Sequence, residues 1–357
     1  MDSTFWMDRA LSLARRALGV TAPNPAVGAV LVKNGRLIGE GFHRGPGQAH
    51  AEAAALDDAL AKGHEVRGST LYVTLEPCCH DGHFKRTPPC AQRLVAEGVA
   101  EVWAAVADPN PLVSGRGRAL LVEAGITFHW GPKPEEAREL IADFSTWIER
   151  RRPFVTLKWA QSLDGRRDHP QPESRWITGA ASRAEVHRQR SQYDTVAVGA
   201  GTLRTDDPSL TVRDAPLGPS GQPRRLLFAG SRPLPEDAKL FTDAYRESTW
   251  IVCSPSSEIW PQAQALVGDR VVPWDGSDPA LLGDLLLKAG FYRIYVEGGP
   301  SLLESLLKWN FWDRMEVFTA PALLSNTPLV LAEPRWRVFG QDTLLEAWNP
   351  AVTCSQV

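Results

Sequence analysis

The feature that most constrains this chain is a set of side chains between residues 50 and 90 that can bind a metal. His50 and Glu52 stand two positions apart, and Cys78 and Cys90 each follow a proline. An imidazole and two thiolates are good zinc ligands, and zinc in proteins takes four. Three protein ligands leave the fourth position to a water, whose pKa falls to about 7 on the metal. The chain must therefore fold so that these distant residues converge.

Glu52 supplies a carboxylate that the metal does not need. H-x-E followed by P-C and a further cysteine is typical of zinc deaminases, in which the glutamate moves protons and is no ligand. Residues 49–61 have helical apolar spacing, which places His50 and Glu52 in one first turn but on different faces. Cys79 adjoins Cys78, so the residue pattern alone leaves open which two of Cys78, Cys79 and Cys90 bind the metal. We favour Cys78 and Cys90, because both follow proline.

The first half of the chain alternates between strand and helix patterns, which predicts a layered α/β domain. Asn34-Gly35 between two apolar runs predicts a hairpin, and residues 70–74 and 101–106 have the composition of strands. A charged helix is expected over residues 134–148, followed by a basic run and Pro153. We place the domain boundary there, between residues 1–148 and residues 149–357.

Composition excludes several classes of protein. The net charge of −3 gives no broad basic surface for nucleic acid. Five cysteines, three of them near one site, indicate metal binding in a reducing compartment and not a disulfide framework. Residues 1–20 form an amphipathic helix pattern unlike a signal peptide, and no apolar run is long enough for a membrane span. We expect a cytoplasmic protein with no nucleic-acid or membrane partner.

The second half of the chain also predicts strands separated by helices. They are expected at residues 154–158, 194–199, 224–229, 249–253, 270–272, 292–297 and 314–319. Glu297-Gly298-Gly299 then joins a strand to a helix at residues 302–309. Glycines there let the backbone approach a ligand, and the N–H groups of a helix start attract phosphate. An ordinary tight turn would show the same pattern.

Taken in order, these motifs resemble the bifunctional riboflavin-biosynthesis enzymes, in which a pyrimidine deaminase is fused to a pyrimidine reductase. The resemblance covers nearly the whole chain. Its motifs are residues 23–28, 50–52, 74–78, 86–90 and 108–111 in the first half, and residues 156–158, 162–165, 176–178, 198–202, 206–211 and 296–299 in the second.

The resemblance implies an α/β fold with two parts, a cytidine-deaminase-like three-layer N-terminal domain and a dihydrofolate-reductase-like C-terminal domain. It implies that a zinc-bound hydroxide deaminates diaminohydroxyphosphoribosylaminopyrimidine to 5-amino-6-(5-phosphoribosylamino)uracil. NADPH then reduces the ribosyl group to a ribityl chain. The cofactors would be Zn²⁺ and NADPH, and the partner a small phosphoribosylaminopyrimidine. We also expect a homo-oligomer.

Site residues are carried over in the same way. Beside the zinc set, the deaminase substrate would contact Asn24, His43, Asp108 and Asn110. The cofactor would contact Ala160, Trp176, Thr202, Asp206, Gly299, Pro300, Ser301, Leu302, Leu303, Glu304 and Ser305. The reductase substrate would contact Ser174, Arg190, Leu210, Arg213 and Glu297, where arginines suit a ribose phosphate. Lys158, expected at a strand end, and Asp206, expected in a loop, would position and protonate the ribosyl group.

The sequence departs from the family pattern in places. Cys79 stands where a serine is usual, the loop before Cys90 is longer, residues 226–231 lack an acidic residue that contacts the cofactor ribose, and residues 324–328 form a shorter segment. Three alternatives follow. The chain could deaminate another base or nucleoside, it could be a non-catalytic zinc-binding protein, or one half could be degenerate, with the reductase the more suspect. Glu52 argues against the second, because a structural site needs no spare carboxylate.

Overall fold

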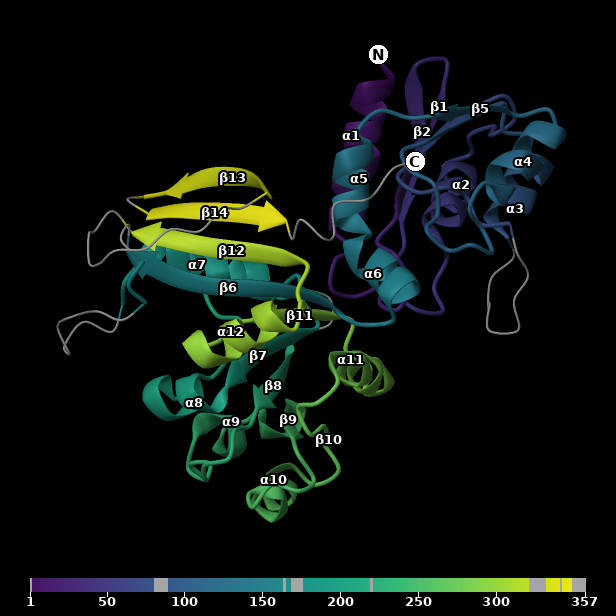
Figure 1. The fold of residues 1–357 in the computed structure, drawn as a ribbon. Helices are drawn as coiled ribbons and strands as arrows, with labels where there is room; N and C mark the ends of the chain where they lie inside the picture. Colours follow the sequence, from purple (N-terminus) through teal and green to yellow (C-terminus); the bar gives the residue numbers. More distant parts are fainter. Residues whose placement is uncertain are drawn as a thin grey trace. The chain divides into compact units, whose positions relative to one another are not determined.

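The computed structural model describes residues 2–79, 89–162, 165–167, 176–218, 221–320, 332–340 and 342–348 (Figure 1). The chain divides into two compact units, Met1–Arg150 and Arg151–Val357, and each is described by itself. No helix within the described ranges combines the length and the apolar composition needed to cross a bilayer.

A five-stranded sheet forms the centre of the first unit, in the order β2-β1-β3-β4-β5. Its strands are β1 (Gly28–Lys33), β2 (Arg36–Phe42), β3 (Thr70–Val73), β4 (Glu101–Ala104) and β5 (Thr127–Trp130). β1 is antiparallel to both β2 and β3, and β3, β4 and β5 are parallel. The Asn34-Gly35 turn closes the β1–β2 hairpin as predicted, with φ of 50° and 70°. The sequence did not predict β5.

Helices cover both faces of this sheet. α1 (Ser3–Arg15) packs so closely on Gly28 that a Cβ there would lie 2.1 Å from a backbone oxygen of α1. A Cβ at Gly41 would lie 2.6 Å from α2 (Ala51–Ala61). Gly41 pairs with Ala29, and successive residues of a strand point to opposite faces, so α1 and α2 lie on opposite sides. The unit has the three layers that the sequence predicted.

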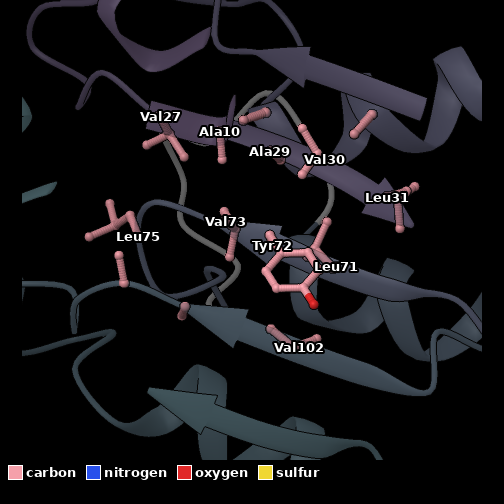
Figure 2. Close-up of a cluster of buried hydrophobic side chains, with 14 of the residues drawn as sticks. Ala10, Val27, Ala29, Val30, Leu31, Leu71, Tyr72, Val73, Leu75 and Val102 are labelled. Carbon is pink, nitrogen blue, oxygen red and sulfur yellow. The ribbon is translucent and has the colours of Figure 1, made fainter. Parts of the chain in front are cut away.

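The remaining helices of the unit are α3 (Cys90–Ala96), α4 (Arg116–Glu123), α5 (Pro134–Leu140) and α6 (Ala142–Arg150). One helix was predicted over residues 134–148. Instead, Ile141 leaves helical geometry with φ −106° and ψ 13°, and its side chain is buried. The apolar core of the unit joins strands β1, β3 and β4 with α1, as Figure 2 shows for Ala10, Val30, Leu71 and Val102.

A nine-stranded sheet forms the centre of the second unit, in the order β10-β9-β8-β7-β11-β6-β12-β14-β13. All neighbours are parallel except β14 with β12 and with β13. The strands are β6 (Phe154–Ser162), β7 (Thr195–Gly199), β8 (Arg224–Phe228), β9 (Thr249–Cys253), β10 (Val271–Pro273), β11 (Arg293–Val296), β12 (Arg314–Ala320), β13 (Ala332–Phe339) and β14 (Asp342–Trp348). The helices are α7 (Ala180–Arg190), α8 (Ala200–Asp206), α9 (Lys239–Thr242), α10 (Trp260–Val267), α11 (Pro279–Lys288) and α12 (Pro300–Lys308), with a 3₁₀ turn at Arg246–Ser248.

Two apolar clusters cover the two faces of this sheet. Val196 and Val198 belong to one and Ala197 to the other, as strand alternation requires. Val296 of β11 pairs with Leu157 of β6 and with Ala197 of β7. Because these strands are parallel, their carboxyl ends lie at one edge, where α/β sheets commonly bind ligands.

Candidate active sites

The first unit brings the three predicted zinc ligands together. His50 is the N-cap of α2, Cys78 follows β3, and Cys90 is the first residue of α3. His50 Nδ1 lies 3.5 Å from Cys78 Sγ and 3.4 Å from Cys90 Sγ, and all three ligand atoms lie within 4.8 Å of one another. One nitrogen and two sulfur donors converging at this spacing fit a zinc ion.

The electrostatics of this cluster suit metal binding and proton transfer. Hydrogen bonding from Cys90, together with His50, holds the pKa of the Cys78 thiol well below its ordinary value, although burial alone would raise it. The lowered pKa favours the thiolate form. Glu52, in the first turn of α2, is only 4% exposed. Burial, and then the negative charge of Cys78, raises the pKa of its carboxyl to about 7. A carboxyl with that pKa can both accept and donate a proton near neutral pH.

Cys79 lies outside the three-residue cluster that could hold a metal. It is a free, half-buried thiol. Burial, and then the nearby charge of Glu76, raises its pKa, which opposes the thiolate form that a metal needs. Residues 80–88 of the predicted long loop lie outside the described residues.

The predicted substrate residues of this unit form two groups. Asn24 Nδ2 lies 3.1 Å from Nε2 of the buried His43, whose Nδ1 lies 3.0 Å from the carbonyl oxygen of Ala49. The ring of His43 packs edge-on against His50 at 5.4 Å, so this group borders the metal ligands. Asp108, which follows β4, accepts a hydrogen bond from the backbone of Asn110 at 2.8 Å.

In the second unit, three predicted residues meet at the carboxyl edge of the sheet. Glu297 follows β11, and its carboxylate accepts from Arg190 Nε at 2.5 Å and from Lys158 Nζ at 3.5 Å. Burial alone would raise the pKa of Glu297, but the charges of Arg190 and Lys158 lower it to about 2. The result is an ionised carboxylate held between two cations.

Some residues differ in position from the prediction. Lys158 lies in the middle of β6 and not at a strand end, because β6 continues to Ser162 by pairing with β12. Asp206 is the last residue of α8 and not a loop residue.

The predicted substrate residues of the second unit differ in burial and in hydrogen bonding. Arg190 ends α7 and also donates from Nη1 to the carbonyl of Thr211 at 2.7 Å, so two of its donors are used within the protein. Leu210 is buried at φ 55°, and the exposed Arg213 donates its backbone N–H to His187. Ser174 lies outside the described residues.

The predicted cofactor residues surround two strand-to-helix turns, β7–α8 and β11–α12. Gly299 caps α12 without a side-chain hydrogen bond to the helix start. A Cβ at Gly299 would lie 3.0 Å from Thr202 Oγ1, so glycine lets the two turns approach closely and a larger residue would require a small shift. Ala160 lies on β6, and Pro300, Ser301, Leu302, Leu303, Glu304 and Ser305 form the first turns of α12. Backbone N–H groups at this helix start fit a pyrophosphate.

Two of the predicted cofactor residues are placed less favourably for contact with a cofactor. Leu303 is fully buried in the core, so its side chain packs inward. Trp176 is 59% exposed, and the guanidinium of Arg183 lies over its ring at 4.9 Å. Its indole is therefore a surface wall and not core packing.

Sequence reasoning missed two buried groups. Glu76 accepts three backbone hydrogen bonds close to the predicted zinc ligand Cys78, and His187 accepts from the backbone of Arg213, a predicted substrate residue of the reductase. Burial lowers the pKa of His187. Bonds to backbone atoms leave no spacing signature, so the sequence indicated no role for either residue, although Glu76 lies within the 74–78 motif.

Comparison with known proteins agrees with these sites. Residues 1–106 match the cytidine and deoxycytidylate deaminase zinc-binding region, and residues 153–337 match the RibD C-terminal domain. The riboflavin biosynthesis protein RibD of Aquifex aeolicus is 41% identical over 90% of this chain and 87% of its own length. That of Escherichia coli is 38% identical over 91% and 89%.

Solved structures show the same likeness over both units. Acinetobacter baumannii RibD has a TM-score of 0.79 at 35% identity, covering 97% of this chain and 98% of that one. A Thermotoga maritima protein described as a diaminohydroxyphosphoribosylaminopyrimidine deaminase/5-amino-6-(5-phosphoribosylamino)uracil reductase has a TM-score of 0.78 at 31% identity, with the same coverage.

Fold and site together define a zinc-dependent deaminase domain joined to a reductase domain, which confirms the predicted fold class. The chain is a bifunctional enzyme with Zn²⁺ and NADPH as its cofactors. It belongs to the family of the riboflavin biosynthesis protein RibD, as the sequence resemblance predicted.

Proposed function

We propose that residues 1–148 deaminate diaminohydroxyphosphoribosylaminopyrimidine and that residues 149–357 reduce the ribosyl group of the product, 5-amino-6-(5-phosphoribosylamino)uracil, to a ribityl chain. The observation that carries this proposal is the buried Glu52 beside three converging ligand atoms in one unit, on a chain whose relatives join both activities. The family matches fall on either side of the proposed boundary.

In the deaminase, His50, Cys78 and Cys90 would hold zinc, which when bound lowers the pKa of a water. Glu52 would take a proton from a water whose oxygen adds to the ring carbon bearing the amino group, and would deliver that proton to the amine, which leaves as ammonia. Its buried carboxyl, with a pKa of about 7, is suited to both transfers. Asn24, His43, Asp108 and Asn110 bind and orient the pyrimidine.

In the reductase, NADPH supplies the hydride when bound. Gly299 to Ser305 hold its pyrophosphate at the start of α12, and Ala160, Trp176, Thr202 and Asp206 contact the rest of it. Arg190, Arg213, Leu210, Glu297 and Ser174 bind the substrate.

Lys158, fixed by Glu297 at 3.5 Å, protonates the ribosyl oxygen as the ring opens, with Asp206 positioning the group.

The first test of the deaminase is Glu52→Gln. The substitution keeps the size of the side chain but removes the proton carrier, so ammonia release should stop while zinc content stays at the wild-type value. Ammonia release at the wild-type rate would refute the role of Glu52. Loss of zinc would show that the carboxylate supports the metal instead.

We also propose that the enzyme works in the cytoplasm and assembles as a homo-oligomer. The cluster of Cys78 and Cys90 with His50, which could hold a metal, suits a reducing compartment. β13 is the outermost strand of its sheet and exposes Trp336 and Val338, and such an edge can pair with a second copy. A monomeric mass by light scattering would contradict the oligomer.

A further inference from the structure

Glu76 is buried two residues before the zinc ligand Cys78, and the mechanism above does not use it. It is 2% exposed. Its Oε2 accepts the backbone N–H of Asp108 at 3.3 Å and of Gly115 at 3.0 Å, and its Oε1 accepts the backbone N–H of Arg118 at 3.0 Å. Charge-assisted bonds of this kind are about twice as strong as neutral ones.

These donors come from two elements far along the chain. Asp108 begins the loop that carries Asn110, and the two are joined by the 2.8 Å bond from Asn110 N to Asp108 Oδ1. Gly115 is the N-cap of α4, at φ 74° and without a side-chain cap of its own, and Arg118 lies in the first turn. The carboxylate of Glu76 therefore caps a helix from a distant strand end.

The start of α4 also lies directly against the ligand segment. A Cβ at Gly117 would lie 2.0 Å from the carbonyl oxygen of Pro77, so no larger residue fits. The backbone of Glu76 is held as well, because its N–H donates to the carbonyl of Val106 at 2.9 Å. One side chain thus joins the segment of Cys78, the loop of Asp108 and the start of α4.

We propose that Glu76 is a positioning residue of the deaminase, which fixes the 108–110 loop relative to Cys78 so that Asp108 and Asn110 hold the pyrimidine at the metal. This inference rests on the proposed function of those two residues. A glutamine at position 76 would keep the shape but turn an NH₂ group toward backbone N–H donors, so at least one of the three bonds is lost.

The kinetic test compares Glu76→Gln with wild type, using the diaminopyrimidine ribotide. KM should rise about tenfold or more, the effect of losing one charge-assisted bond. Zinc content should stay unchanged, and kcat per bound zinc should change by less than about threefold. A merely structural role would lower the active fraction and hence kcat, with KM unchanged. An unchanged KM, or loss of zinc, would overturn the proposal.

Glu101→Gln is the matched control, because Glu101 lies on β4 of the same sheet and its carboxylate is bound by side chains, Thr70 Oγ1 at 3.0 Å and His129 Nε2 at 3.2 Å. It should leave KM at the wild-type value. An equal rise of KM in the control would show a general effect of changing a carboxylate in this unit, and would contradict the special role of Glu76.

A second measurement needs no substrate. Amide hydrogen exchange at Asp108, Gly115 and Arg118 should be about tenfold faster in Glu76→Gln than in wild type, while exchange in β1 stays the same. Unchanged exchange at these amides would overturn the proposal whatever the kinetics show. If wild-type protein released no ammonia, the proposed function would fail, and the exchange result would still decide whether Glu76 holds the loop.

Discussion

Replacing Glu297 by glutamine should destabilise the second unit in a way that depends on pH. The side chain is 12% exposed and lies between Arg190 and Lys158. Burial would raise the pKa of its carboxyl, but the two cations lower it from 4.5 to about 2. The substitution removes this negative charge, so Arg190 and Lys158 lose the carboxylate that they pair with.

The size of the effect follows from the pKa difference. A fall from 4.5 in the unfolded chain to about 2 in the folded protein corresponds to about 3 kcal/mol of folding free energy. Because the folded pKa is the lower one, this stabilisation is complete above pH 4.5 and is lost as pH falls toward 2. At pH ~3.5 part of it, on the order of 1 kcal/mol, should already be lost relative to neutral pH.

Amide hydrogen exchange in β11 measures this stability locally, which avoids treating a two-unit chain as a single unfolding transition. At neutral pH the β11 amides should exchange about a hundredfold faster in Glu297→Gln than in wild type, and the ratio should fall about tenfold by pH ~3.5. A ratio that does not change with pH would show that the ionised carboxylate of Glu297 does not stabilise the second unit.

Glu185→Gln is the control for this experiment. Glu185 is a buried carboxylate of α7 that pairs with Arg188, whose side chain is 44% exposed. This variant still contains Glu297, so its β11 amides should keep the pH dependence of the wild type. Loss of that dependence in the control would mean that another group causes it.

Three further predictions separate the metal ligands and the two activities. Cys79→Ser should leave zinc content unchanged, because burial keeps that thiol protonated. Cys90→Ser should lose most of the metal. A halved zinc content in Cys79→Ser would overturn the choice of Cys78 and Cys90 as ligands. Removing zinc with a chelator should stop ammonia release but not the oxidation of NADPH by the deaminated pyrimidine, and loss of both would contradict the assignment of one reaction to each unit. Lys158→Met should stop NADPH oxidation while ammonia release continues, so an unchanged oxidation rate would exclude Lys158 as proton donor.

The zinc cluster could be predicted from the sequence because few residue types bind zinc. His50, Cys78 and Cys90 come together in the structure, and Glu52 is buried beside them. The alternating pattern of strands also sufficed for the two α/β units. Metal-ligand chemistry and strand periodicity both depend directly on residue type, so the zinc cluster and the two α/β units could be predicted from the sequence.

Other features depend on tertiary contacts and left no such pattern. α7 was not predicted, because it buries polar residues such as Glu185 and Gln189 in place of an apolar stripe. The helix break at Ile141 and the extension of β6 beyond Lys158 follow from burial and from pairing with β12. Glu76 meets backbone N–H groups only through the fold.

The most direct test of the central claim is a two-stage assay of the purified wild-type protein. Diaminohydroxyphosphoribosylaminopyrimidine is supplied first and ammonia is measured, and NADPH is then added and its absorbance followed. We expect ammonia release without NADPH, followed by oxidation of NADPH in an amount equal to the ammonia released. No ammonia, or oxidation of NADPH by the substrate before any ammonia appears, would contradict it.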